Sequence, residues 1–219
     1  LRGANGNWDA GAALFGARAR GVDVDAAWIP APGWRLAVAV YYLDSTFQDF
    51  RDASCYPTPA QTIAQGCVRV GGAALPPEAT QCQGVPQVAC AQDLSGFATS
   101  YVPRWSGNLS LRYGRNLATR TPGSPLKAEA TLEVMATDSY STSVNGAPGS
   151  RQAGFGKLDA RLAIGTVDGR WELALVGRNL TDVIHANWYE PLPGGGLDSG
   201  WSASTARPRQ AGIQARLSF

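Results

Sequence analysis

QAGIQARLSF, residues 210–219, alternates apolar and polar side chains without a break. Every second residue of this stretch is apolar: Ala211, Ile213, Ala215, Leu217 and Phe219. A period of two predicts a β-strand with one apolar and one polar face. An exposed strand of a soluble domain rarely finishes on a large aromatic residue. In a membrane β-barrel such a ring lies in the interfacial belt, so this stretch favours a barrel strand.

Six earlier segments show the same alternation, at residues 22–28, 34–42, 105–113, 126–134, 158–164 and 171–178. Strands adjacent in sequence pair most simply as an antiparallel meander. We therefore expect an all-β fold, an antiparallel transmembrane β-barrel meander of about seven strands. Seven strands cannot close such a barrel, so we expect residues 1–219 to be a fragment. Further strands would lie upstream, or copies would assemble.

Composition narrows the class of protein. The formal net charge of +2 gives no reason to expect nucleic acid or an acidic partner. The longest apolar run, residues 36–43, is too short for a membrane helix, which needs about 20 residues. Barrel strands hide their apolarity by alternation, so this does not count against a β-barrel.

The connections alternate between short and long, as they do when a meander crosses a membrane. Residues 30–33 and 167–169 form short turns, whereas residues 51–100 form a long loop that we expect to be extracellular. Five aromatic residues of the apolar parity lie at the strand ends that the short turns join, and they predict a membrane girdle: Trp28, Trp34, Tyr113, Trp171 and Phe219. A soluble β-sandwich would bury its aromatic residues in mid-strand.

The opposite parity carries the charged and amide side chains that would line a lumen: Asp23, Asp25, Arg35, Asn108, Arg112, Glu129, Glu133, Asp159, Arg161, Glu172, Arg178, Gln214 and Arg216. Facing lipid near the midplane, each Arg or Lys would cost ~2–4 kcal/mol. The pattern therefore assigns this face to the lumen.

Four motifs resemble TonB-dependent outer-membrane receptors. Asn179-Leu180-Thr181-Asp182 resembles the signature near the end of their penultimate strand, and residues 207–219 resemble their terminal strand with its Pro-Arg entry and final aromatic. Residues 20–25 (RGVDVD) and 103–109 (PRWSGNL) are similar to recurrent strand starts in the same barrels. The matches follow the order of the family and span most of the chain.

The resemblance implies the C-terminal part of a barrel of about 22 strands with a plugged lumen, located in the bacterial outer membrane. Such receptors take up a scarce nutrient, such as a siderophore, cobalamin or an oligosaccharide, with energy delivered through TonB. The N-terminal plug, with its TonB contact, is absent from residues 1–219. The family's terminal strand is also read by the outer-membrane assembly machinery. The ligand, a small molecule or metal chelate, is not identified by the sequence.

All four cysteines, Cys55, Cys67, Cys82 and Cys90, fall in the long loop. Three pairings are open to them; two local disulfides, Cys55–Cys67 and Cys82–Cys90, would brace a loop on an oxidising surface, with a zinc site as the weaker alternative. We interpret His185 as a loop surface residue. The aromatic residues Trp188, Tyr189 and Trp201 would be interfacial anchors or loop packing. For all four residues the alternative is contact with a ligand.

No catalytic triad, metal cluster or nucleotide loop is evident, so we expect neither an enzyme nor a cofactor. Two rivals to the receptor stay open. One is another outer-membrane barrel, such as a porin-like channel, and the other is a soluble all-β binding module.

Overall fold

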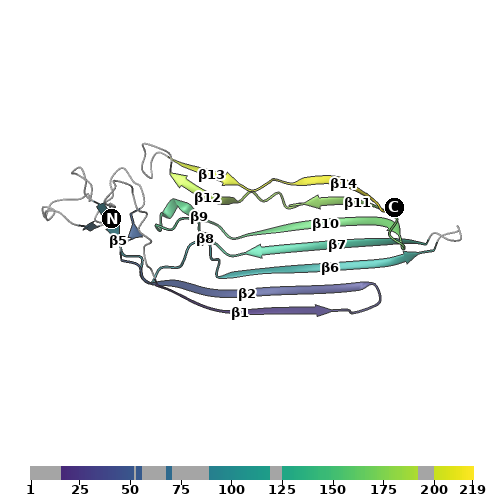
Figure 1. Ribbon diagram of the computed structural model, residues 1–219, viewed down its shortest axis with the longest axis horizontal. Helices are drawn as coiled ribbons and strands as arrows, with labels where there is room; N and C mark the ends of the chain where they lie inside the picture. Colours follow the sequence, from purple (N-terminus) through teal and green to yellow (C-terminus); the bar gives the residue numbers. More distant parts are fainter. Residues whose placement is uncertain (1–15, 52, 56–67, 71–88, 119–124, 192–199) are drawn as a thin grey trace.

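The computed structural model describes residues 16–51, 53–55, 68–70, 89–118, 125–191 and 200–219. Its main feature is one sheet of seven strands: β1 (Gly16–Trp28), β2 (Trp34–Asp49), β6 (Trp105–Leu117), β7 (Leu126–Thr137), β10 (Phe155–Thr166), β11 (Trp171–Arg178) and β14 (Gln210–Leu217). They follow one another across the sheet in chain order, and each neighbouring pair is antiparallel (Figure 1). The predicted all-β meander is confirmed. The sheet is open, with β1 and β14 as its edges.

The register keeps the two predicted faces separate across the whole sheet. Val24 pairs with Val40, Leu109 with Val134, and Leu175 with Ile213, so apolar residues meet apolar residues on every strand. A slip of one residue anywhere would move a strand's apolar set to the other face. The alternation in the sequence is therefore realised as two continuous surfaces, an apolar face and a polar face.

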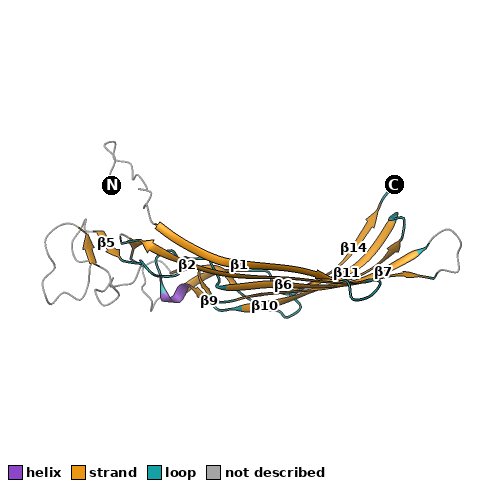
Figure 2. Ribbon diagram, turned by 90° about the horizontal axis from the view of Figure 1, so that it is seen from below, coloured by secondary structure: helices purple, strands orange, loops and turns teal. Residues whose placement is uncertain are grey.

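Both faces of this sheet are open over its length in the described part of the chain. Seen edge-on, the sheet is a single bowed and twisted layer (Figure 2). Large residues of the apolar face are well exposed, with Leu162 at 58%, Leu175 at 56% and Ile213 at 74% of full accessibility. A soluble domain would bury such a surface under a second layer.

Short turns lie at one end of the sheet, together with the C-terminus (Figure 1). The β1–β2 turn depends on Gly33, whose φ of +85° is accessible to glycine without strain. Its carbonyl accepts a hydrogen bond from the Gly114 amide at 2.8 Å, and a Cβ at this position would collide with the Gly114 carbonyl oxygen. Gly169 has a φ of +77° in the β10–β11 turn. This end of the sheet is called the turn end below.

The long connections gather at the opposite end, called the loop end, and carry short elements that the sequence did not predict. These are β3 (Ala53–Ser54), β4 (Val68–Val70) and β5 (Ala89–Gln92) in one sheet; β8 (Tyr140–Ser141) paired with β9 (Arg151–Gln152), next to the 3₁₀ turn η2 (Pro148–Ser150); and β12 (Ala186–Pro191) paired with β13 (Trp201–Thr205). They are too short to show a clear alternation. The predicted long loop at residues 51–100 thus contains three short strands, β3, β4 and β5.

The hydrophobic core also lies at the loop end. Phe47, at the end of β2, packs with Ala53 and Leu94, and Phe50 covers them. Backbone hydrogen bonds from the Phe47 amide to the Phe97 carbonyl and from the Leu94 amide to the Phe50 carbonyl close this unit. Packing therefore stabilises the connections, whereas the sheet itself relies on its ladder of backbone hydrogen bonds.

Candidate functional site

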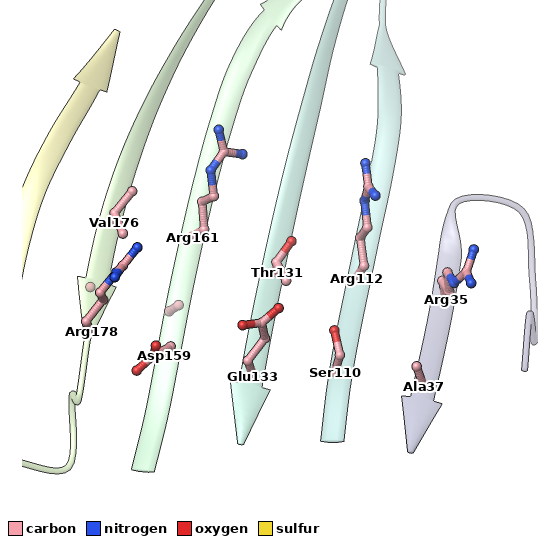
Figure 3. A pocket seen from close by; sticks show the side chains of 12 residues that line it. Arg35, Ala37, Ser110, Arg112, Thr131, Glu133, Asp159, Arg161, Val176 and Arg178 are labelled. Atoms are coloured by element: carbon pink, nitrogen blue, oxygen red, sulfur yellow. The ribbon is translucent and has the colours of Figure 1, made fainter. Parts of the chain in front are cut away.

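The polar face of the sheet is hollowed into a cavity of about 410 Å³ that extends over five strands, from β2 to β11. Six charged side chains line it: Arg35, Arg112, Arg161, Arg178, Glu133 and Asp159 (Figure 3). All six were predicted to share the polar parity. What the sequence could not show is that they meet around one hollow.

The register places like charges opposite each other at two points in this cavity. Arg35 is the cross-strand partner of Arg112, and Glu133 is the partner of Asp159. Like charges in this position destabilise a sheet. Because these two like-charge pairs destabilise the sheet, we interpret the cavity as a surface that binds positive and negative groups from outside the sheet.

Two of the arginines are already neutralised. Arg112 forms an ion pair with Glu129, and Arg161 donates a hydrogen bond to Glu172 at 2.5 Å. Within the described residues, neither Arg35 nor Arg178 takes part in an ion pair. These two guanidinium groups, each with several fixed N–H donors, are therefore the positions most suited to hold a carboxylate or another anion.

The signature segment Asn179–Asp182 borders the cavity and forms a clasp between three strands. The backbone amide of Asn179 donates to the Asp159 carboxylate at 2.7 Å, which fixes this lining residue. The buried Asn179 amide group donates to the carbonyls of Val183, at 3.0 Å, and Arg207, at 3.2 Å, and its oxygen accepts from the Val183 amide at 3.1 Å. The side chain thus joins the exit of β11 to the entry of β14.

The rest of the signature extends the clasp. The Leu180 amide donates to the Leu158 carbonyl at 2.7 Å, and Thr181 Oγ1 donates to the Gly156 carbonyl at 3.3 Å. Asp182 accepts the Arg209 amide at 2.9 Å. Asn179 and Asp182 have positive φ values of 50° and 53°, a region that Asn and Asp tolerate better than most residues. In this structure the signature positions strands.

On the apolar face, two aromatic pairs mark the limits of an apolar band. Trp34 and Tyr113 lie at the turn end with ring centroids 4.6 Å apart, and Tyr42 and Trp105 lie nearer the loop end, also 4.6 Å apart. Tyr42 follows Trp34 by eight residues along β2, which is ~26 Å along a strand. Between these pairs, the described residues of this face carry no charge. The sequence pattern predicts only the girdle at the turn end.

The predicted girdle residues lie along a line that is inclined to the cross-strand rows of the sheet. The cross-strand row of Trp34 reaches β11 at Leu175, and Trp171 lies four residues further toward the turn end. Four residues are ~13 Å along a strand and four strand spacings are ~19 Å across the sheet, so the line of aromatic residues is inclined by ~35°. The row reaches β14 at Ile213, and Phe219 lies six residues further, which gives ~40°. Transmembrane barrels have strand tilts of about 35–45°.

His185 lies against the polar face at the loop end, where its ring stacks on Phe155 at 4.1 Å. Burial, and then the Lys157 ammonium, lowers the pKa of His185 below its ordinary value of 6.5. Among the described residues, its buried Nδ1 has no hydrogen-bond partner. His185 is therefore a loop residue whose ring packs on strand β10.

The aromatic residues of the same connection pack on the neighbouring loop. The Tyr189 amide donates to Thr142 Oγ1 at 3.3 Å, and the Trp201 indole lies against Gly149, where any Cβ would collide with it. Trp188 is 40% exposed. Tyr140 has Tyr101 and Tyr189 as neighbours, a group that the sequence did not predict. Burial raises the pKa of Tyr140, and the neighbouring Tyr101 and Tyr189 raise it further. Contact of Trp188, Tyr189 and Trp201 with a ligand stays a prediction.

Of the four cysteines, Cys55 is buried and disulfide-bonded. Cys67 and Cys82 lie outside the described residues, so both predicted pairings stay predictions. No three His, Cys, Asp or Glu side chains in the described part of the chain are grouped so that they would hold a metal ion. In the same residues, no helix is long and apolar enough to cross a membrane.

Comparison with known proteins bears on the fold. No protein-family model matches the chain, and no curated protein matches it. Among solved structures, it is similar to the ferric yersiniabactin uptake receptor FyuA from Yersinia pestis, with a TM-score of 0.59 and 17% sequence identity. The match covers 94% of this chain but 24% of that receptor, so the chain spans about a quarter of its length. At this identity the likeness shows the fold alone, an antiparallel meander similar to part of the barrel of that receptor.

Proposed function

We propose that this chain forms the C-terminal part of a TonB-dependent receptor barrel in a bacterial outer membrane. One observation carries the proposal: a sheet of seven strands exposes an uncharged apolar face, bounded at both limits by aromatic residues and staggered at the tilt of a barrel. With a tilt of ~35–40°, the ~26 Å between the aromatic pairs becomes a band ~20 Å high, close to the roughly 25 Å apolar band of outer-membrane barrels.

The polar face then lines the lumen. Its charges stay away from lipid, where an arginine near the midplane would cost ~2–4 kcal/mol. The cavity around Arg35 and Arg178 is the surface that a plug or a passing solute would meet. The resemblance and the similarity to an uptake receptor favour active import of a scarce nutrient, such as a siderophore, cobalamin or an oligosaccharide. The plug and its TonB contact would come from outside residues 1–219.

Strand direction argues against a barrel built from copies of this sheet alone. Because the sheet has an odd number of strands, β1 and β14 run in the same direction. Joining β14 to β1, in the same chain or in a copy inserted the same way, would require a parallel pair. All six pairs in this sheet are antiparallel. An antiparallel barrel is completed by an odd number of additional strands.

Epitope insertion tests the membrane orientation. In the complete protein expressed in a Gram-negative host, a short epitope is inserted after Val144, which is 64% exposed at the loop end, or after Asp168 in the turn between β10 and β11. We expect antibody to label intact cells only with the first insertion, and both insertions after the membrane is permeabilised. The proposal is wrong if both are labelled equally on intact cells, or if the protein is folded in the soluble fraction.

Conductance separates the receptor from a porin-like channel. A channel leaves a steady open pore when the purified complete protein is added to a planar lipid bilayer, whereas a plugged receptor does not. Steady conductance would favour the channel. Dependence of solute uptake on an energised inner membrane would favour the receptor.

A further inference from the structure

The apolar face changes character just beyond the Tyr42–Trp105 pair, at the loop end of β1 and β2 (Figure 1). Arg20 and Arg18 continue the apolar parity of β1 beyond Val22. Their cross-strand partners on β2 are Asp44 and Thr46. The outward surface therefore passes within two residues from uncharged to strongly cationic.

Asp44 forms its ion pair with Arg104, at 3.5 Å, rather than with Arg20, its cross-strand partner. In the described part of the chain, neither Arg18 nor Arg20 has an ion pair, and both are exposed. Arg18, Arg20, Arg104 and Asp44 together carry a formal charge of +2. The next charged residues along β2, Asp49 and Arg51, pair with each other at 3.2 Å.

The height of this cluster matches the headgroup layer of a bilayer. With strands tilted by ~35–40°, Arg20 comes to about the level of Tyr42, and Arg18 and Arg104 lie roughly 5–7 Å beyond it. The headgroup region on each side of the hydrocarbon core is ~5–8 Å thick. Arg18 and Arg20 lie on the apolar face at this level. Arg104 starts from the opposite parity, but its guanidinium reaches Asp44, the cross-strand partner of Arg20. Guanidinium groups bind phosphate through paired N–H donors.

We propose that Arg18, Arg20 and Arg104 form a site for the phosphate of an anionic lipid headgroup, on the membrane side that carries the long loops. This inference rests on the proposed membrane orientation. The half-buried Thr46, the cross-strand partner of Arg18, borders the site, and its hydroxyl accepts a hydrogen bond from the Gln48 side chain at 3.1 Å. The turn end has a matched residue: Arg115 continues the apolar parity of β6 beyond Tyr113, opposite Ala128. It is a single interfacial arginine outside the cluster.

The test compares three forms of the complete protein: wild type, the double variant Arg18→Gln/Arg20→Gln, and the control Arg115→Gln. Each is folded into phosphatidylcholine vesicles and then purified in a neutral detergent. Native mass spectrometry measures the phosphatidylglycerol concentration that gives half occupancy. Because a basic residue near an anionic surface contributes about fivefold in affinity, we expect roughly 30-fold weaker binding in the double variant and wild-type binding in Arg115→Gln.

Three results would overturn the lipid site: unchanged binding in the double variant, an equal loss in Arg115→Gln, or displacement of the lipid by inorganic phosphate at lower concentration than the lipid itself. The last result would assign the arginines to a soluble anion instead. A failure of the membrane proposal can be distinguished from a failure of the lipid site. In that case the wild-type protein would not enter the phosphatidylcholine vesicles at the first step. Heat-dependent gel mobility shows whether all three forms are folded.

Discussion

Ala215 and Gln214 are neighbours on β14 that face opposite sides of the sheet, and they offer a sharp test of the membrane assignment. Ala215 lies four residues from Phe219 in the girdle, and the apolar band is eight residues deep on β2, so Ala215 lies at mid-band. Gln214 points to the polar face opposite Ala174. Both residues are exposed in the open sheet. Arginine at either position makes the same change in charge.

In a membrane, Ala215→Arg places a guanidinium near the bilayer midplane, whereas Gln214→Arg places it in the lumen within reach of other polar groups. We expect Ala215→Arg to lower the free energy of unfolding by ~2–4 kcal/mol, a factor of about 30 to 1,000 in the folding equilibrium. For Gln214→Arg we expect a change within about 0.5 kcal/mol, as for most surface substitutions.

The assay is denaturant unfolding of the complete protein in phospholipid vesicles, followed by heat-dependent gel mobility. The difference between the two variants is the decisive quantity, since each serves as the control for the other. Equal effects at the two positions would refute the assignment of the apolar face to lipid. So would a larger loss in Gln214→Arg.

Three further predictions concern the clasp, the turn end and the loop end. Asn179→Ala removes the hydrogen bonds of this side chain to Val183, Arg207 and Thr181 at a buried position with positive φ, so we expect a loss of about 2–3 kcal/mol in the same unfolding assay. A loss below that of the exposed Thr181→Ala would contradict the clasp. Gly33→Ala and Gly169→Ala both strain a positive φ, at a cost of about 1 kcal/mol each. A Cβ at Gly33 would also collide with the Gly114 carbonyl, whereas nothing lies near Gly169, so we expect the larger loss of stability from Gly33→Ala. Equal losses would argue against the close approach of Gly33 and Gly114. Because the folded-state pKa of His185 is lowered, its neutral form stabilises the loop end above pH 6.5, and this contribution is lost as the pH falls through the folded pKa. His185→Gln should remove that dependence between about pH 5 and 8, and an NMR titration giving His185 a pKa above 6.5 would contradict it.

Much of the sheet could be predicted from the sequence, because a strand's side chains alternate with a period of two. This period located all seven strands, separated the two faces and predicted which end of the sheet carries the short turns. The same logic failed for β12 and β13, which together span only eleven residues with no clean alternation. It also failed for the short strands of the long loop, where the pairing of β3 with β5 depends on contacts between distant segments.

By itself, the sequence determined the strands, the separation of their two faces and the placing of aromatic residues at the turn end, since each depends on local periodicity along the chain. Only the tertiary structure decided which charged residues share a cavity, that the second aromatic pair lies ~26 Å along the strands from the first, and how the aromatic residues are staggered across the sheet. It also showed that Asn179 reaches Arg207, 28 residues away in the chain. Such properties depend on how strands are staggered against one another, and backbone pairing across the sheet sets that stagger.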